Sequence, residues 1–415
     1  MVRDRPDLGS YALGPAAVDY ERRVDLAAVR ERRAERACVA MAEAGCDALL
    51  LYKDENVRYV SGLRAQVIQG KSALLNGCLL RADGAIALFL SGGELDRARQ
   101  AMPWVDEIQA IPIMEARGLI EGAVEHALAP VLARLGLTDA RLGLDELAYA
   151  QVLALRRLLP RVELADGDAA MQSARLVKDP GEIAIMQEAS AIAEAVTQSA
   201  IDAVKPGVRE YDVVAEAMRT LYRLGGEMAH VATPFVASGE HMSPPNRFAS
   251  DKLIREGDLV FIDIGAMWNG YYADLGRTVI CGRPSRRQRE VYTAVHHALR
   301  AATAAMAAGS TTDDVAVAVR DEAAARGLGG DLLSLFIGHG VGMGANEPPY
   351  VGETLPGAET VTLRPGMTMA VEPLIWVPGV RGGAGVRLED TIVVGQEAGV
   401  ALTRTGFDER LLLEP

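Results

Sequence analysis

The sequence predicts an α/β protein of two consecutive domains, and three observations lead to this prediction. Helix-like and strand-like segments alternate through residues 23–170, a pattern typical of a sheet covered by helices. A clear helix-start signal follows near residue 180 and opens a second unit. That unit contains a weak internal repeat with a spacing of about 102 residues, which indicates two related halves. The chain of 415 residues is long enough for about two or three domains.

The first domain is predicted from apolar runs that turn residues separate. In chain order, these runs predict a helix over residues 32–43, strands at residues 48–52, 77–80 and 85–90, and helices over residues 119–135 and 149–159. We therefore expect an N-terminal extension over residues 1–22, an α/β domain over residues 23–172 and a second domain over residues 173–415.

The second domain is expected to begin with a long helix. Residues 179–182 are Asp-Pro-Gly-Glu, which places a capping aspartate before the helix, proline at its first position and glutamate three residues after the cap. Apolar residues then recur at helical spacing until the Lys-Pro-Gly sequence at residues 205–207. The internal repeat pairs residues 203–226 with residues 308–330. If both copies fold alike, two α/β halves pack around a pseudo-two-fold axis with a site between them.

Composition excludes several classes of partner. The chain carries a formal net charge of −13 and only 5% aromatic residues, whereas nucleic-acid-binding proteins usually present basic surfaces and stacking aromatics. Its four cysteines are too few and too irregularly spaced for a disulfide scaffold or a cysteine zinc site. The first twenty residues lack the apolar region of a secretory signal, and no apolar run approaches the ~18 residues of a membrane span. We expect a cytoplasmic protein with no nucleic-acid or membrane partner.

The most informative segment covers residues 258–281. Asn269-Gly270 lies between two β-rich runs in this segment, and Asn-Gly is the strongest short signal of a β-hairpin with a two-residue turn. Such a turn pairs Trp268 with Tyr271. The rest of the register follows from this pair, because each further step outward adds one residue on either strand.

Two aspartates occupy this hairpin. In the predicted register Asp263 faces Gly276, and Asp274 faces Gly265. The two aspartates are then diagonal neighbours on one face, roughly 7–8 Å apart at Cα. Because glycine has no side chain, we expect open space beside both carboxylates. Two solvated aspartates on an edge hairpin are the simpler alternative.

Two glutamates occupy a similar pair of strands later in the chain. Glu372 interrupts the apolar run 367–375, and Glu389 lies in the β-rich segment 385–392. Four buried carboxylates cannot all be ionised unless cations compensate them. Two divalent ions would balance four negative charges, and oxygen-rich ligation with one imidazole suits Mn, Fe, Co or Zn.

His339 is the candidate imidazole. It lies in a glycine-rich stretch, residues 337–342, and the flanking glycines let the backbone bring this side chain into a crowded site. The alternating glycines could also suggest a dinucleotide-binding loop, but that loop needs a helix directly after it. The Asn-Glu-Pro-Pro sequence at residues 346–349 blocks such a helix.

With these residues in view, the chain resembles the pita-bread metallohydrolases, which include aminopeptidase P, prolidase, methionine aminopeptidase, creatinase and dimethylsulfoniopropionate lyase. The resemblance covers about residues 25–410 and includes, in order and spacing, all five of that family's dinuclear metal ligands. The matching residues are Asp263, Asp274, His339, Glu372 and Glu389. Segments 47–62 and 175–182 resemble the creatinase-type N-terminal domain and its linker. The resemblance implies a creatinase-type α/β domain, a pita-bread catalytic domain with a pseudo-two-fold repeat, and a homodimer.

The sequence departs from the peptidases of this family at two histidine positions. Where those enzymes carry accessory histidines, this chain has Asn246 and Asn346. Asparagine can donate a hydrogen bond to a carbonyl or an oxyanion, but it cannot transfer a proton near neutral pH. Asn246 and Asn346 are therefore candidate substrate-binding residues. His241 is a third candidate, since its loop could reach the site, and the same holds for His230, although a structural role is the simpler interpretation of both histidines.

The resemblance implies a dinuclear metal-dependent hydrolase that acts on a small amide or peptide. Glu372 would pass the proton of the attacking water to the leaving nitrogen, and Arg387 would brace the carboxylates. Manganese is the favoured metal, with iron, cobalt and zinc as alternatives. Because both accessory histidines are replaced, a non-peptidase relative stays open, either a C–N hydrolase or a lyase of a small polar metabolite. A binding protein without metals is disfavoured, since all five ligand positions are filled.

Overall fold

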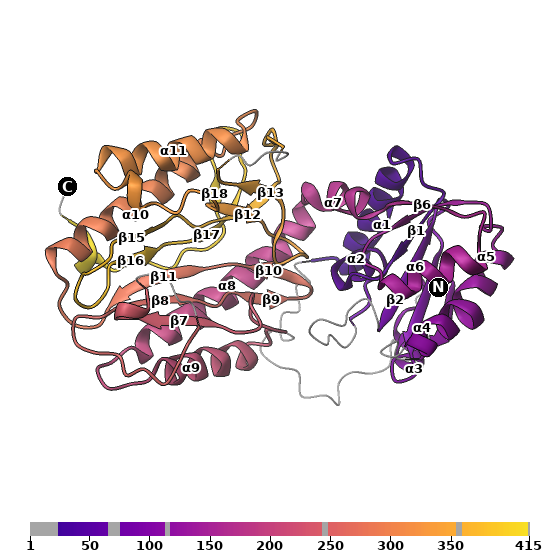
Figure 1. Cartoon of the computed structure of the whole chain (residues 1–415), viewed down its shortest axis with the longest axis horizontal. Coiled ribbons are helices and arrows are strands. Elements are labelled where there is room, and N and C mark those ends of the chain that lie inside the picture. The colour runs from indigo at the N-terminus through magenta and orange to yellow at the C-terminus, as the bar shows by residue number, and fades with distance from the viewer. Residues whose placement is uncertain (1–23, 65–74, 113–116, 243–247, 354–358, 414–415) are drawn as a thin grey trace. The chain divides into compact units, whose positions relative to one another are not determined.

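In a computed structural model that describes residues 24–64, 75–112, 117–242, 248–353 and 359–413, the chain divides into two units. One unit covers residues 25–176 and the other covers residues 177–415. Both units mix helices with strands, as expected for an α/β protein (Figure 1). Within the described part of the chain, no helix combines the length and the apolar character that crossing a membrane requires.

The first unit is built on a mixed six-stranded sheet with the strand order β4-β3-β2-β1-β5-β6. Its strands are β1 (Ala48–Leu51), β2 (Asn76–Arg81), β3 (Ile86–Ser91), β4 (Glu107–Ile111), β5 (Arg141–Leu144) and β6 (Glu163–Asp166). Its helices are α1 (Leu26–Glu43), α2 (Asp54–Ser61), α3 (Leu95–Ala101), α4 (Arg117–Ala123), α5 (Ala129–Arg134), α6 (Tyr149–Leu158) and α7 (Asp168–Leu176). Ala48 and Leu50, alternate residues of β1, share one buried cluster with apolar residues of α4, α5 and α6. These helices therefore cover one face of the sheet.

The strand predictions for this unit are confirmed where the strand is a continuous apolar run and fail where polar residues interrupt it. The predicted strands at residues 48–52, 77–80 and 85–90 correspond to β1, β2 and β3. The pattern does not predict β6, because its four residues, Glu-Leu-Ala-Asp, contain no apolar run. The single helix expected over residues 119–135 is interrupted by a π-helical turn, Val124–Leu128, in which the backbone hydrogen bonds shift by one residue.

The second unit opens with the expected helix, α8 (Pro180–Ala203). The Asp179 side chain accepts hydrogen bonds from the backbone N–H groups of Gly181 and Glu182 at 2.6 and 3.0 Å. The Glu182 carboxylate accepts in turn from the Asp179 N–H at 2.8 Å, which completes the predicted capping box. Glu182 also accepts a hydrogen bond from the Tyr271 hydroxyl at 2.8 Å. The start of the helix is thus tied to the hairpin that carries the two aspartates.

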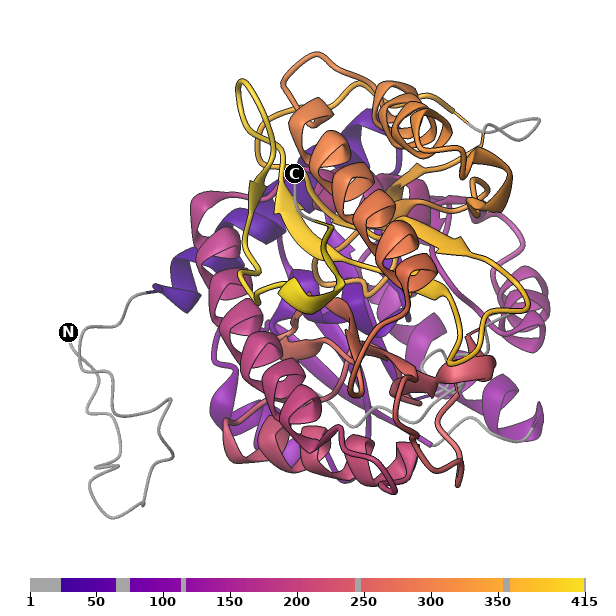
Figure 2. The ribbon, with the colours of Figure 1, turned by 90° about the vertical axis from the view of Figure 1, so that its left-hand side faces the viewer.

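This unit consists of two similar halves, each with a helix pair followed by strands. In the first half α8 packs against α9 (Glu210–Arg223), and in the second half α10 (Arg286–Ala305) packs against α11 (Thr312–Ala325). α9 and α11 start 102 residues apart, at Glu210 and Thr312, which is the spacing of the sequence repeat. Figures 1 and 2 show the pair α8–α9 on one side of the strands and the pair α10–α11 on the other.

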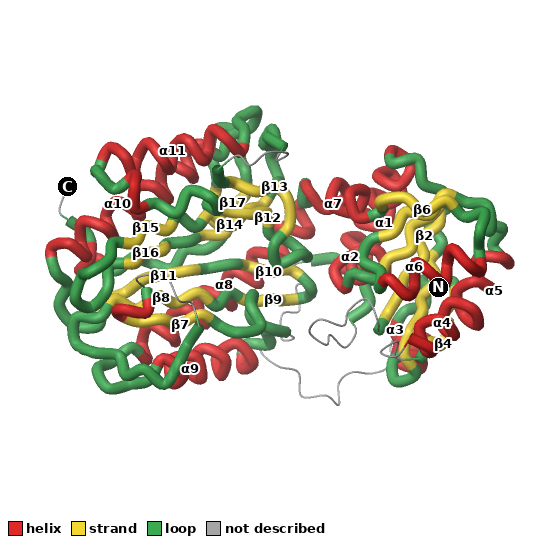
Figure 3. Tube along the Cα trace, viewed as in Figure 1, coloured by secondary structure: helices red, strands yellow, loops and turns green. Residues whose placement is uncertain are grey.

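The strands between the helix pairs form two larger sheets and two short ribbons (Figure 3). The sheets have the orders β11-β8-β7 and β13-β12-β14-β17-β18, and the ribbons are β9-β10 and β15-β16. The strands are β7 (Phe235–Ser238), β8 (Leu259–Asp263), β9 (Ala266–Trp268), β10 (Tyr271–Ala273), β11 (Gly276–Ile280), β12 (Gly338–Gly340), β13 (Glu347–Val351), β14 (Thr368–Val371), β15 (Leu374–Trp376), β16 (Gly385–Arg387), β17 (Asp390–Val393) and β18 (Val400–Ala401). One buried cluster joins α8, α9 and β8, through residues such as Ala189, Val213 and Val260.

His296 on α10 gives this unit a pH-dependent contribution to stability. Its ring packs edge-on against Phe407 at 4.6 Å, and burial together with His297, Arg300 and Arg277 lowers its pKa from 6.5 to about 4. Between these two pH values the unfolded chain binds the proton and the folded chain does not, so stability decreases as the pH falls through this range. We expect His296→Asn to remove this contribution. Urea-unfolding midpoints at about pH 5 and about pH 7 should then differ less in the variant than in the native protein, and parallel profiles would contradict the prediction.

Candidate metal centre

The aspartate hairpin has the predicted register. Tyr271 pairs with Trp268 in the β9–β10 ribbon, and Gly276 pairs with Asp263 where β11 meets β8. The ladder is interrupted between these two parts, at residues 264–265 and 274–275. Asp263 ends β8 and Asp274 lies in the interruption, so both carboxylates are located where the two strands stop pairing.

The glutamate strands repeat this arrangement in the second half. β14 pairs with β17 and β15 pairs with β16 in one continuous register. Glu372 lies between β14 and β15, and Glu389 lies between β16 and β17, so the register places the two glutamates opposite each other. Each half of the unit therefore supplies two acids at a break in an antiparallel strand pair.

The glycines opposite the two aspartates do not leave open space, so that expectation is wrong. A Cβ at Gly276 would come within 2.7 Å of Glu389 Oε2. A Cβ at Gly265, whose φ is +59°, would come within 2.6 Å of both the His230 Cβ and the Ala273 carbonyl oxygen. The space beside each aspartate is filled by a side chain from a distant segment. Glycine is needed there because any larger residue would displace that side chain.

The structure brings together the five residues predicted as metal ligands. Asp263, Asp274, His339, Glu372 and Glu389 are each at most 4% exposed. His339 Nε2 lies 3.4 Å from Glu372 Oε1 and 3.6 Å from Asp274 Oδ2. The ligand-type atoms form three groups, each with members within 4.8 Å of one another: His230, Asp274 and His339; His339, Glu372 and Glu389; Asp263, Asp274 and Glu389. Groups that share members in this way suit two neighbouring ions with common carboxylate ligands.

Arg387 compensates part of the negative charge in this cluster. Its Nη1 lies 2.7 Å from Glu372 Oε2 and 3.6 Å from Asp263 Oδ2. One guanidinium cannot offset four buried carboxylates, and burial together with Asp274 raises the pKa of Asp263 to about 7. Burial and the same aspartate raise the pKa of Glu389 well above its usual value. In the metal-free protein, protons therefore neutralise part of the cluster.

Two buried oxygens of the cluster have no hydrogen-bond donor among the residues that the structure describes. They are Asp263 Oδ1 and Glu389 Oε2. A buried carboxylate oxygen without a donor is costly, and a bound cation would remove that cost. Carboxylate oxygens with an imidazole nitrogen are also a donor set that Mn, Fe, Co and Zn accept. The residues present therefore fit divalent metal ions.

Asn346 lies beside the cluster, whereas Asn246 is outside the described residues. The Asn346 Oδ1 is 3.2 Å from His230 Nε2, which is itself 3.0 Å from Asp274 Oδ2. His230 thus belongs to the cluster, although the sequence favours only a structural role for it. Burial alone would raise the pKa of Asp274, but the charge and hydrogen bond of His230 lower that pKa below its usual range. The sequence signal that could have found His230 is Gly265, which makes room for it.

His241 lies away from the carboxylates. It follows β7, and the first residue of that strand, Phe235, is the one that pairs with Asp263. His241 is therefore beyond the opposite end of β7. There its Nδ1 lies 3.3 Å from Glu210 Oε1 without a hydrogen bond between them, whereas the Ser238 N–H and hydroxyl both donate to this oxygen at 2.8 Å and tie the end of β7 to α9.

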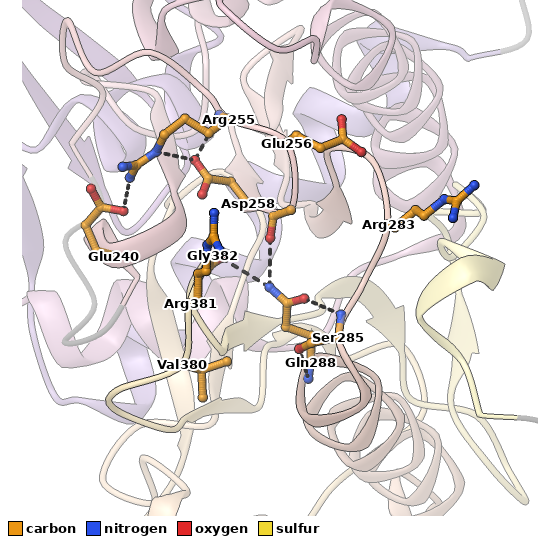
Figure 4. Close-up of a pocket in the computed structure, with 11 residues that line it drawn as sticks. Glu240, Arg255, Glu256, Asp258, Arg283, Ser285, Gln288, Val380, Arg381 and Gly382 are labelled. Atoms are coloured by element: carbon orange, nitrogen blue, oxygen red, sulfur yellow. Dashed lines mark hydrogen bonds and ion pairs between the residues drawn. The ribbon is translucent and has the colours of Figure 1, made fainter.

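A separate cavity of about 590 Å³ lies at the start of α10, and its lining includes none of the cluster residues (Figure 4). Arg255 pairs there with Glu240 and Asp258. The buried Gln288 amide donates to the Gly257 carbonyl oxygen at 3.0 Å. Because these polar groups bond to one another, they stabilise the surrounding loops, and the carboxylate cluster is the stronger candidate for a functional site.

Most of the chain is similar to proteins of a known family. The model of Metallopeptidase family M24 matches residues 184–396, and that of the Creatinase/Prolidase N-terminal domain matches residues 33–177. An Xaa-Pro dipeptidase of Pyrococcus horikoshii is 30% identical over 86% of this chain and 93% of its own length. A probable dipeptidase, PepE, of Mycobacterium tuberculosis is 32% identical over 92% of this chain and 96% of its own length. The solved structure of an Xaa-Pro dipeptidase from Bacillus anthracis matches with a TM-score of 0.76 and 27% identity, over 91% of this chain and 99% of that one.

Proposed function

The chain belongs to metallopeptidase family M24, and on this basis we propose that it hydrolyses short peptides, with Xaa-Pro dipeptides as its first substrate class. As a member of this family it is a metal-dependent hydrolase. The observation that carries the proposal is the buried cluster of ligand-type side chains, with two carboxylate oxygens that lack donors, inside the segment that the family model matches. The relatives named as Xaa-Pro dipeptidases suggest the substrate class.

In this proposal the cluster holds two ions and handles one proton. The ligands would be Asp263, Asp274, His339, Glu372 and Glu389. Bound ions would lower the pKa of a water molecule toward neutrality and polarise the scissile carbonyl. Glu372 would pass a proton from the attacking water to the leaving nitrogen, and Arg387, 2.7 Å from its Oε2, would hold this carboxylate in place. Arg387 also approaches Asp263, and so holds two of the carboxylates in their places.

The names of the relatives do not favour the alternative of a C–N hydrolase or lyase of a small metabolite. The replacement of a family histidine by Asn346 still has a chemical consequence. An amide cannot exchange a proton near neutral pH, so proton transfer in this enzyme would depend on Glu372. The proposed role of Asn346, and of Asn246, is to bind an oxygen atom of the substrate.

We further propose manganese as the metal, a homodimer as the assembly and the cytoplasm as the compartment. Oxygen-rich ligation supports manganese, with iron, cobalt and zinc as alternatives. The cysteines Cys38, Cys46, Cys78 and Cys281 are all unpaired in the structure, which supports a reducing compartment. Light scattering of the purified protein tests the homodimer, and metal analysis of protein purified without added metal tests the manganese.

Metal removal combined with a peptide panel tests the proposed function. Activity is expected to fall at least about 100-fold after treatment with a chelator and to return with Mn²⁺ or Co²⁺, because the ions supply the nucleophile. Xaa-Pro dipeptides are expected to be cleaved faster than matched dipeptides with alanine in the second position. Full activity of the metal-free protein would overturn the metal dependence. Inactivity across the whole panel, in protein that has bound its metals, would instead favour the non-peptidase alternative.

A further inference from the structure

The backbone holds His230 beside the aspartate hairpin. The His230 N–H donates to the Ile264 carbonyl oxygen at 2.9 Å. Two residues before His230, the Met228 carbonyl oxygen accepts a hydrogen bond from the Met267 N–H at 2.8 Å. These bonds run along the residues that directly follow Asp263, so the segment around His230 forms an additional edge of the hairpin. The position of His230 is therefore set by the strands that carry the acids.

The His230 ring is fixed by its neighbours. It stacks on the His339 ring with 5.9 Å between centroids and 11° between planes, and it meets the Tyr272 ring edge-on at 5.9 Å. The missing side chain at Gly265 provides the room for its Cβ. The His230 side chain is only 7% exposed. A ring packed in this way cannot turn freely, and its Nε2 has a defined direction.

Three oxygen atoms surround the Nε2 atom of His230. Asp274 Oδ2 lies at 3.0 Å, the Ala345 carbonyl oxygen at 3.2 Å and Asn346 Oδ1 at 3.2 Å. A ring nitrogen that faces three acceptors carries the hydrogen and donates it. When Asn346 Oδ1 accepts this bond, the Nδ2 amino group of the same side chain is left to face away from the ring. Asn346 is exposed, so this amino group can meet a substrate.

We propose that His230 is a positioning residue, whose Nε2–H joins the Asp274 carboxylate to Asn346 and holds the Asn346 amide as a hydrogen-bond donor for the substrate. The proposal rests on the proposed function, because it concerns the substrate of the same metal centre. The loop that carries Asn346 has its own anchor, since Lys178 Nζ lies 2.6 Å from Glu347 Oε1 and both side chains are buried. His230 therefore sets the orientation of the amide, while the Lys178–Glu347 pair sets the position of the loop.

The chemistry of the substrate follows from this orientation. An amino group turned away from the His230 ring at this exposed position can bind an acceptor, such as the carbonyl oxygen of a peptide bond or a free C-terminal carboxylate. An asparagine without a fixed orientation would as readily present its own oxygen, which repels such an acceptor. His230 thus favours substrates with an acceptor oxygen at this point, although it does not itself contact them.

A double-mutant cycle tests the proposal. His230→Ala, Asn346→Ala, the double variant and His230→Gln are assayed with the Xaa-Pro dipeptide that the native protein cleaves best. We expect His230→Ala to raise KM about 10-fold at saturating Mn²⁺, the size of one lost hydrogen bond. Its Mn²⁺ affinity should fall by no more than about 100-fold, the range for losing the hydrogen-bond partner of a ligand. The double variant should lose no more than Asn346→Ala alone. His230→Gln should recover part of the loss, since glutamine also carries an N–H donor. His297→Gln, on α10 and outside the cluster, is the matched control.

Each other outcome has a distinct meaning. Additive losses in the cycle would show that His230 acts without Asn346 and would overturn the proposal. A fall in Mn²⁺ affinity of more than about 100-fold, beyond the cost of losing the hydrogen-bond partner of a ligand, would identify His230 as a metal ligand and would overturn it as well. If the native protein cleaves no dipeptide, the proposed function fails, but the contact between the two residues can still be measured. Shifts of the urea-unfolding midpoint should then be non-additive in the same cycle, and additive shifts would refute the inference. Circular dichroism verifies that each variant folds.

Discussion

Asp274→Asn is expected to abolish activity, with a loss in kcat/KM of at least about 1000-fold, or roughly 4 kcal/mol of transition-state stabilisation. The Asp274 carboxylate groups with Asp263 and Glu389, and its Oδ2 also lies 3.6 Å from His339 Nε2, so both ion positions would depend on it. The amide keeps the shape of the side chain but loses its charge and one metal-binding oxygen. Steady-state kinetics and metal analysis after reconstitution with Mn²⁺ measure the effect.

The control for this variant is Glu397→Gln, which removes one negative charge at an exposed position. It should retain native activity and native metal content, because Glu397 belongs to none of the ligand groups. The net charge of the protein changes equally in both variants, so a difference between them is local to the cluster. A fully active Asp274→Asn protein would contradict the assignment of Asp274 as a ligand. An inactive variant with a native metal content would also contradict it, since the loss would then arise from another role.

Arg387→Met is expected to destabilise the metal-free protein by about 3–5 kcal/mol, the usual effect of leaving a buried charge without its partner. The substitution roughly conserves volume but leaves Glu372 and Asp263 without the guanidinium that lies 2.7 and 3.6 Å from them. Saturating Mn²⁺ should reduce the difference, because bound ions supply the missing positive charge. Urea unfolding with and without Mn²⁺ measures both values.

A second arginine provides the comparison for Arg387. Arg286 on α10 is highly exposed and pairs with Glu290 at 3.0 Å, so Arg286→Met should change stability by less than about 1 kcal/mol. An equal loss of stability for Arg387→Met with and without Mn²⁺ would show that Arg387 contributes packing alone. In that case the guanidinium would not be the charge that holds the carboxylates together.

Local signals in the sequence predicted much of the fold and four of the carboxylates of the site. The Asp179–Glu182 capping box is a short-range interaction, and it is present as predicted. The Asn269-Gly270 turn determined the whole register of its hairpin, since pairing proceeds outward from the turn. The strands β4, β5 and β6 were not predicted, because they lack the continuous apolar runs of β1 and β3 and are placed by pairing with neighbours in the sheet.

The sequence by itself determined which strand pairs the acids belong to and the register that sets Asp263 opposite Gly276, because turn chemistry and strand register depend on neighbouring residues. Only the tertiary structure decided what fills the space beside Gly276 and Gly265. Glu389 reaches Gly276 from more than a hundred residues away in the chain, and His230 reaches Gly265 from several tens of residues away. Both depend on backbone pairings that no local pattern predicts. The contact between His230 and Asn346 is of the same kind. Side chains that meet in a buried site are brought together by the packing of the fold as a whole, and for this reason the structure was needed to place His230 in the metal centre.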